Sequence, residues 1–214
     1  EIYVIINFRV WLRAELVMDT TFLRELSLLV RSPKKGIDEI FWFGTLEKGI
    51  KAGLAGWCAT HMLGFALGIV LLPLVAAFGG FFLGFIPAVY GIFSILREVI
   101  GLGIYWFVGS FILWKLLSVL LDREFDFKQV LMGTAYIEGY TGVLGLALIL
   151  VSIICIYLAP ILMVLLVPLG LAYVGAVIYV AVMLLSRLMN VEPLTVGAVY
   201  VVLFLINLLY NWIM

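Results

Sequence analysis

Residues 99–150 decide the fold: VIGLGIYWFVGSFILWKLLSVLL (99–121), then DREFDFKQ (122–129), then VLMGTAYIEGYTGVLGLALIL (130–150). The outer segments are almost entirely apolar, whereas the eight residues between them carry five charges. A segment of about 20 apolar residues can cross the roughly 30 Å hydrocarbon layer of a bilayer. The charged segment must lie in water, so this stretch predicts a hairpin of two transmembrane helices.

The composition of the whole chain agrees with this prediction. Of the 214 residues, 66% are hydrophobic and 12% are charged, whereas a soluble domain carries about 25% charged residues. We therefore expect an all-α, polytopic membrane helix bundle whose first partner is the lipid bilayer. The formal net charge is zero and no basic tract occurs, which excludes a nucleic-acid partner. Cys58 and Cys155 lie in apolar segments at a spacing that fits no zinc or redox motif, so no cofactor or metal is expected.

Residues 1–51 are predicted to form a cytoplasmic and interfacial region before a transmembrane domain over residues 52–214. Met18 is a candidate start, so we place little weight on residues 1–17. Residues 19–31 predict an amphipathic helix that is too charged to cross a bilayer. Its apolar side holds Phe22, Leu23, Leu26, Leu29 and Val30, and its charged side holds Arg24, Glu25 and Arg31. Its apolar side either lies at the headgroup boundary or packs on the rest of the protein.

Basic and aromatic side chains follow this helix. Arg31, Lys34 and Lys35 form a basic cluster, which either contacts anionic lipid headgroups or only sets the orientation of the chain. In the interfacial segment 37–51, the run FWF at residues 41–43 resembles an aromatic belt, with Lys48 and Lys51 on its water side.

Five crossings are expected, at about residues 52–78, 99–121, 133–157, 161–186 and 194–213. Segment 79–98 contains Pro87 and several glycines and is expected to be re-entrant or interfacial. With five crossings, twelve of the thirteen lysines and arginines lie on one side, and only Arg97 lies opposite. If segment 79–98 also crossed, the division would be nine to four. The positive-inside rule favours five, with the N-terminus in the cytoplasm and the C-terminus outside. In the first crossing, Thr60, Gly64 and Gly68 form a stripe of small residues that would let another helix approach closely.

Three ionisable residues fall within the predicted crossings, where they are costly and indicate a functional site. At 1.5 Å per residue, Lys115 lies about 10 Å and Glu138 about 12 Å below the same surface. These matching depths predict an ion pair; the alternatives are that Lys115 snorkels to the surface and that Glu138 reaches water. His61 lies near the midplane, where it serves either as a proton relay or ligand, or as a neutral side chain bonded to a neighbouring helix.

Other polar and aromatic side chains on these helices complete the set of candidates. Tyr136 and Tyr140 flank Glu138 and are expected to donate to its carboxylate. Tyr105, Trp106 and Trp114 are expected to face lipid or another subunit, which leaves room for a homo-oligomer or a protein partner. No HExxH, GxSxG or phosphate-binding loop occurs, so the chain is expected not to be an enzyme.

A short motif at the entry to the third predicted helix resembles a known family. The segment FDFKQV at 125–130, followed by Ala135-Tyr136, and the earlier Arg31-Ser32-Pro33 are similar to the Yip family of five-crossing membrane proteins (Rab/Ypt-interacting proteins and their prokaryotic relatives), over roughly residues 22–214. The resemblance implies a five-helix bundle in a prokaryotic cytoplasmic membrane. The chain departs from the family where Glu138-Gly139 replaces a proline, and it lacks the Asp-Leu-Tyr-Gly-Pro-like segment of the trafficking members, so GTPase binding is not carried over.

Two functions follow from these observations. The first is a non-enzymatic scaffold or membrane-organising protein, trafficking-like in character, that acts through helix packing and contacts with partners or lipids. The alternative is a small transporter or channel subunit that uses Glu138, Lys115 and His61 as an intramembrane polar site.

Overall fold

The computed structural model describes residues 21–61, 100–101, 103–104, 106–157 and 164–213, and every regular element in these ranges is a helix. The elements are α2 (Thr21–Arg31), α3 (Pro33–Phe43), a helix over residues 46–61, the helix Trp106–Leu121, α6 (Phe127–Tyr157), α7 (Leu166–Met189) and α8 (Pro193–Ile213). The predicted all-α class is confirmed for this part of the chain.

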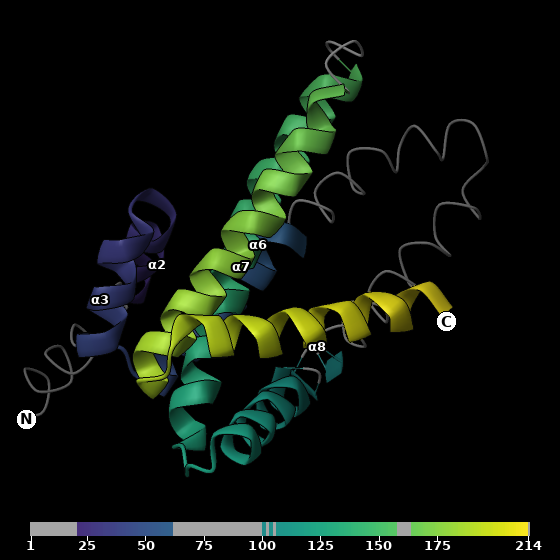
Figure 1. Ribbon diagram of the computed structural model, residues 1–214. Helices are drawn as coiled ribbons and strands as arrows, with labels where there is room; N and C mark the ends of the chain where they lie inside the picture. The colour runs from purple at the N-terminus through teal and green to yellow at the C-terminus, as the bar shows by residue number, and fades with distance from the viewer. Residues whose placement is uncertain (1–20, 62–99, 102, 105, 158–163, 214) are drawn as a thin grey trace, which may run out of the picture.

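The antiparallel helices α6 and α7 run side by side and form the longest part of the molecule (Figure 1). Their contact is tight: a Cβ added to Gly133 of α6 would lie 2.9 Å from Cδ1 of Leu188 in α7. Buried side chains of α7, including Val180 and Leu184, complete this interface. Within α6 and α7, the segments Phe127–Ser152 and Leu166–Met189 are long and apolar enough to cross a membrane.

The predicted ends of these two helices need correction. The third crossing was expected to begin at residue 133, but α6 begins at Phe127 because the Asp126 carboxylate accepts the backbone N–H of Lys128 at 2.9 Å, as an N-cap does. The fourth was expected to end at residue 186, but α7 continues to Met189 and ends at Asn190, which adopts the left-handed conformation with φ 51°.

The remaining predicted crossings are only partly matched. In the second predicted crossing, Trp106–Leu121 is an apolar helix that is shorter than a membrane span. The same holds for the apolar segment Pro193–Leu203 at the start of α8. The described residues thus hold two helices of membrane-spanning length and hydropathy, and not the five that were expected. Segment 79–98 and the greater part of the first crossing lie outside the described residues.

The helix over residues 46–61 packs on α6 with almost no side chain between the two backbones. A Cβ on Gly139 of α6 would lie 2.5 Å from the carbonyl oxygen of Ala52, and a Cβ on Gly53 would lie 3.1 Å from that of Ala135. Glycines at such a crossing let the backbones touch. Of the predicted stripe, Thr60 lies at this interface, because a Cβ on Gly145 of α6 would lie 3.5 Å from its Cγ2. Gly64 and Gly68 are outside the described residues. The helix also runs through the domain boundary that was predicted between residues 51 and 52.

Helices α2 and α3 form a hairpin, called here the N-terminal hairpin, that packs beside α6 and α7 (Figure 1). Proline at the first position of α3 cannot continue α2, so the chain turns at Ser32. Leu26 and Leu29 of α2 are buried in one core with Ile37 and Ile40 of α3. Of the two alternatives for the amphipathic helix, the structure therefore shows the one in which its apolar side packs on the protein.

Candidate functional site

Glu138 lies well inside α6, about 17 Å along the axis from Phe127 at 1.5 Å per residue. Its side chain is partly buried. Among the residues that the structure describes, no side chain or backbone group forms a hydrogen bond or an ion pair with its carboxylate. A carboxylate at this depth without a partner is unusual, because a buried charge is normally paired.

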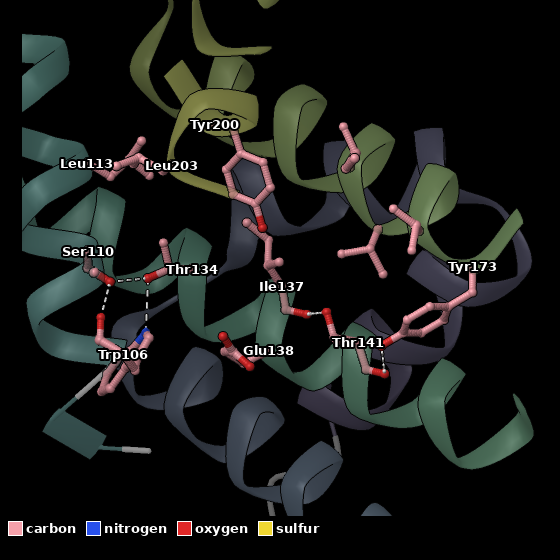
Figure 2. A pocket seen from close by; sticks show the side chains of 14 residues that line it. Trp106, Ser110, Leu113, Thr134, Ile137, Glu138, Thr141, Tyr173, Tyr200 and Leu203 are labelled. Atoms are coloured by element: carbon pink, nitrogen blue, oxygen red, sulfur yellow. Dashed lines mark hydrogen bonds between the residues drawn. The ribbon is translucent and has the colours of Figure 1, made fainter. Parts of the chain in front are cut away.

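Glu138 lines a cavity of about 330 Å³ at the meeting point of four helices (Figure 2). The Trp106–Leu121 helix, α6, α7 and α8 all contribute to its wall. Part of the lining is aliphatic, from residues such as Leu113, Ile137 and Leu203. The side chains that bring polar atoms or aromatic rings to it, apart from Glu138, are Trp106, Ser110, Thr134, Thr141, Tyr173 and Tyr200.

The hydroxyl groups on one side of this cavity bond to one another and to the backbone. The indole Nε1 of Trp106 donates to Oγ1 of Thr134 at 2.9 Å, and the Ser110 and Thr134 hydroxyl oxygens lie 2.7 Å apart (Figure 2). Ser110 also lies 2.7 Å from the carbonyl oxygen of Trp106, to which it donates. These bonds fix the Trp106 ring against α6.

The opposite side of the cavity is closed by Tyr173 of α7. Its hydroxyl donates to the carbonyl oxygen of Thr141 at 3.4 Å, and the Thr141 hydroxyl donates to the carbonyl oxygen of Ile137 at 2.8 Å (Figure 2). The side chains of Trp106, Ser110, Thr134, Thr141 and Tyr173 therefore donate to acceptors other than Glu138, which is the charged residue among the described residues that line the cavity.

A second cavity, of about 240 Å³, shares Glu138 and Trp106 with the first. Its other lining residues come from the 46–61 helix, among them Leu54 and Trp57, and from Gly103 and Ala135. Glu138 is thus accessible to a ligand from either of two neighbouring cavities.

The predicted ion pair between Lys115 and Glu138 is wrong for this structure. Lys115 is exposed, with its Nζ 5.7 Å from the centre of the Trp114 ring. The buried face of its helix instead holds Ser110, Leu113 and Leu117. Matching depths were not sufficient, because the direction in which a helical side chain points depends on its position around the axis as well as along it.

His61 contacts two residues of its own helix. Its Nδ1 lies 3.0 Å from the carbonyl oxygen of Trp57 and 3.3 Å from Oγ1 of Thr60. Its ring stacks on the Trp57 ring with centroids 4.4 Å apart. His61 is not among the residues that line either Glu138 cavity, so the structure does not bring it together with Glu138.

The two tyrosines that were expected to donate to Glu138 do not do so. The Tyr136 hydroxyl donates to Oε2 of Glu25 in α2. Tyr140 is buried in the core and is not among the residues lining the Glu138 cavities.

Glu25 belongs to a second polar cluster that the sequence did not reveal. Its side chain is 2% exposed and forms an ion pair with Lys48 at 3.1 Å. Lys48 also donates to the carbonyl oxygen of Phe43 at 3.0 Å. Glu25 had been placed on the water side of its helix, and Lys48 on the water side of the interfacial segment. The sequence did contain one indication that Glu25 is buried: it lies four residues before Leu29, and residues four apart lie on the same face of a helix.

The predicted lipid-contact residues lie on the surface. Arg31, Lys34 and Lys35 are all exposed near the turn of the N-terminal hairpin. At the other end of α3, Trp42 is 70% exposed and Phe43 is 61% exposed. Trp106 and Trp114, which were expected to face lipid or another subunit, bond inward, Trp106 to Thr134 and Trp114 to the carbonyl oxygen of Phe125. Tyr105 lies outside the described residues.

In comparisons with protein-family models, curated proteins and solved structures, no match was found. The class defined by the fold and the site is therefore a helical protein with two helices of membrane-spanning length and hydropathy and a partly buried carboxylate between its helices.

Proposed function

We propose that this chain is a non-enzymatic integral membrane protein of Yip-like type that organises the membrane or a partner at the cytoplasmic face. In this proposal the bundle has five crossings in a prokaryotic cytoplasmic membrane, with the N-terminus inside and the C-terminus outside. The observation that carries the proposal is the N-terminal hairpin, which is fixed to the bundle and presents basic and aromatic side chains.

The hairpin is fastened to the bundle at two places. At α2, buried Glu25 bonds to Lys48 and to Tyr136 of α6. At α3, Asp38 lies 3.8 Å from Arg187 of α7, whose guanidinium lies 4.8 Å from the centre of the Phe41 ring. Contacts with three different helices of the bundle hold the hairpin in one orientation.

The exposed side of α3 suits a membrane surface. Lys35 and Trp42 are seven residues apart, which places them on the same side of the helix two turns from each other. Basic side chains near an anionic surface contribute about 1 kcal/mol each, and tryptophan favours the headgroup region.

The contacts of the hairpin also support the proposed orientation. Arg187 lies in the last turn of α7, next to the loop before α8, and it meets α3. Tyr136 lies in the first third of α6, after the charged loop 122–126, and it meets α2. The hairpin and both charged loops therefore belong to one end of the α6–α7 pair, as the positive-inside argument requires.

The proposal can be tested with a fluorophore on α3. In a chain without native cysteines (Cys58→Ser, Cys155→Ser), an environment-sensitive dye is attached at Trp42→Cys, and the protein is reconstituted in nanodiscs with or without anionic lipid. We expect a blue shift of the emission with anionic lipid that is lost in Lys34→Gln/Lys35→Gln. A dye at Glu124→Cys, in the loop before α6, is the matched control and should not respond to these substitutions. An emission at Trp42→Cys that is independent of lipid charge would contradict the proposal.

A second candidate function, a small transporter or channel subunit, is favoured by one observation: Glu138 lines two adjoining cavities. Lys115 and His61 do not line either of them, so in this candidate Glu138 alone carries the polar site. Proton or ion flux into liposomes that is abolished by Glu138→Gln, and retained in Glu192→Gln, would support transport. Equal flux in both variants would contradict it.

A further inference from the structure

We propose that the Glu138 cavity binds an organic ammonium ion, with the ammonium group at the carboxylate and an apolar substituent among the aliphatic and aromatic side chains. The inference depends on the membrane placement proposed above, and not on the scaffold function or on transport.

The chemistry of the lining residues favours a cation. Among the described residues that line the two cavities, Glu138 is the charged one, and none is a lysine or an arginine. The predicted partner, Lys115, is exposed on its helix. An ionised carboxylate away from bulk water is strongly destabilised unless a cation or hydrogen-bond donors accompany it.

The size and the oxygen atoms of the site disfavour a bare metal ion. A hard metal cation such as Mg²⁺ or Ca²⁺ needs about six oxygen ligands close around it. The Ser110 and Thr134 hydroxyls bond to each other and the Thr141 hydroxyl to its own helix, so they do not converge on Glu138. The cavity of about 330 Å³ instead falls in the range of organic ligand pockets, which is about 300–1,000 Å³.

Aromatic rings complete the chemistry. Trp106, Tyr173 and Tyr200 line the same cavity as Glu138 (Figure 2), and a cation is attracted to the faces of such rings. Trp106 and Tyr173 are each held by a hydrogen bond, so their rings are already oriented before a ligand arrives. The aliphatic side chains of the lining, among them Leu113, Val177 and Leu203, fit the hydrocarbon part of the ligand.

Ammonium groups reach a membrane protein from two sources, the headgroups of amine-bearing lipids and free amines in solution. The experiment uses the full chain in nanodiscs of phosphatidylglycerol, a lipid without an amine, and measures binding of radiolabelled benzyltrimethylammonium against empty discs. The neutral probe is neopentylbenzene, which has nearly the same shape without the charge. Repeating the titration in discs that contain phosphatidylethanolamine separates the two sources.

We expect saturable binding of the ammonium probe and much weaker binding of the neutral one. Glu138→Gln should weaken binding by about tenfold to a hundredfold, and Tyr173→Leu by about threefold to tenfold. Glu192→Gln, at an exposed carboxylate before α8, should leave it unchanged. Competition by phosphatidylethanolamine would assign the site to a lipid headgroup, and lack of competition would assign it to a free amine.

Three results would overturn the inference: no saturable binding to the wild-type chain, equal binding of the charged and neutral probes, or equal binding by wild type and Glu138→Gln. If Glu138→Gln fails to fold, Glu138→Asp keeps the charge but moves it, and unchanged affinity in that variant would also count against the site. Failure here would leave the dye experiment on α3 unaffected, so the two proposals can fail separately.

Discussion

Tyr136 of α6 donates its hydroxyl to the carboxylate of Glu25 in α2, across 111 residues of sequence. Both side chains are buried, and Lys48 completes the cluster at 3.1 Å from the other carboxylate oxygen. One charged side chain of the N-terminal hairpin is therefore satisfied by two other helices. This arrangement makes the hairpin part of the bundle.

Removing the tyrosine hydroxyl should loosen the hairpin. Tyr136→Phe leaves one oxygen of a buried carboxylate without its donor, so we expect a loss of about 1–3 kcal/mol in the free energy of unfolding in detergent. Tyr179→Phe is the matched control, because Tyr179 lies exposed on α7. Equal effects of the two substitutions, measured by thermal or denaturant unfolding, would show that the hydroxyl contributes nothing.

The Glu25–Lys48 pair should show strong coupling in a double-mutant cycle. Lys48→Met alone leaves a buried carboxylate uncompensated and should cost about 3–5 kcal/mol, whereas Glu25→Gln/Lys48→Met together should cost less than the sum of the single changes. The comparison is the exposed pair Glu47–Lys51, whose members lie one turn apart in the 46–61 helix with a 2.7 Å separation. Its coupling should be about 0.3–0.5 kcal/mol. Similar coupling energies for the two pairs would contradict the burial of Glu25.

Substitution of glycines by alanine should distinguish the close contact between α6 and the 46–61 helix from the general effect of alanine on helix stability. A Cβ on Gly139 would lie 2.5 Å from the Ala52 carbonyl oxygen, whereas a Cβ on Gly175 of α7 would meet nothing within 4 Å. We expect Gly139→Ala to destabilise the protein by about 1–3 kcal/mol through overpacking. Gly175→Ala should be neutral or stabilising by up to about 1 kcal/mol, because alanine is the better helix former. If both variants unfold alike, the two helices do not touch at Gly139.

The absence of contact between Lys115 and Glu138 can be tested by additivity. Because Lys115 is exposed and Glu138 lines a cavity, Lys115→Met and Glu138→Gln should change the free energy of unfolding independently, with the double variant within about 0.5 kcal/mol of the sum. A coupling of 1 kcal/mol or more would restore the ion pair that the matching depths predicted.

The sequence predicted the helical elements well, because each depends on local information. Long apolar segments and the amphipathic pattern of residues 19–31 locate the ends of α6, α7, α8 and α2 to within six residues. The exact ends of the helices were harder to predict. Asp126 caps the start of α6 through a side-chain hydrogen bond, which a hydropathy pattern does not reveal.

The partners of the polar residues could not be predicted in the same way. Glu138 was identified as the intramembrane carboxylate, but its neighbours depend on how four helices meet. Glu25 was assigned to water because its own helix offers it a polar side, and only the approach of α6 and Lys48 makes that position buried. Contacts between distant segments are therefore the information that hydropathy and helical periodicity lack.

In the membrane placement that we propose, the N-terminal hairpin and the charged loops of the bundle lie on one side of the bilayer. The most direct test of this placement is labelling of single cysteines by an impermeant maleimide in intact cells and in lysed cells, in the chain with Cys58 and Cys155 replaced by serine. Lys34→Cys, Arg123→Cys and Glu192→Cys, all exposed positions, should be protected in intact cells and react together after lysis. Reaction of Lys34→Cys and Arg123→Cys from opposite faces would contradict the account.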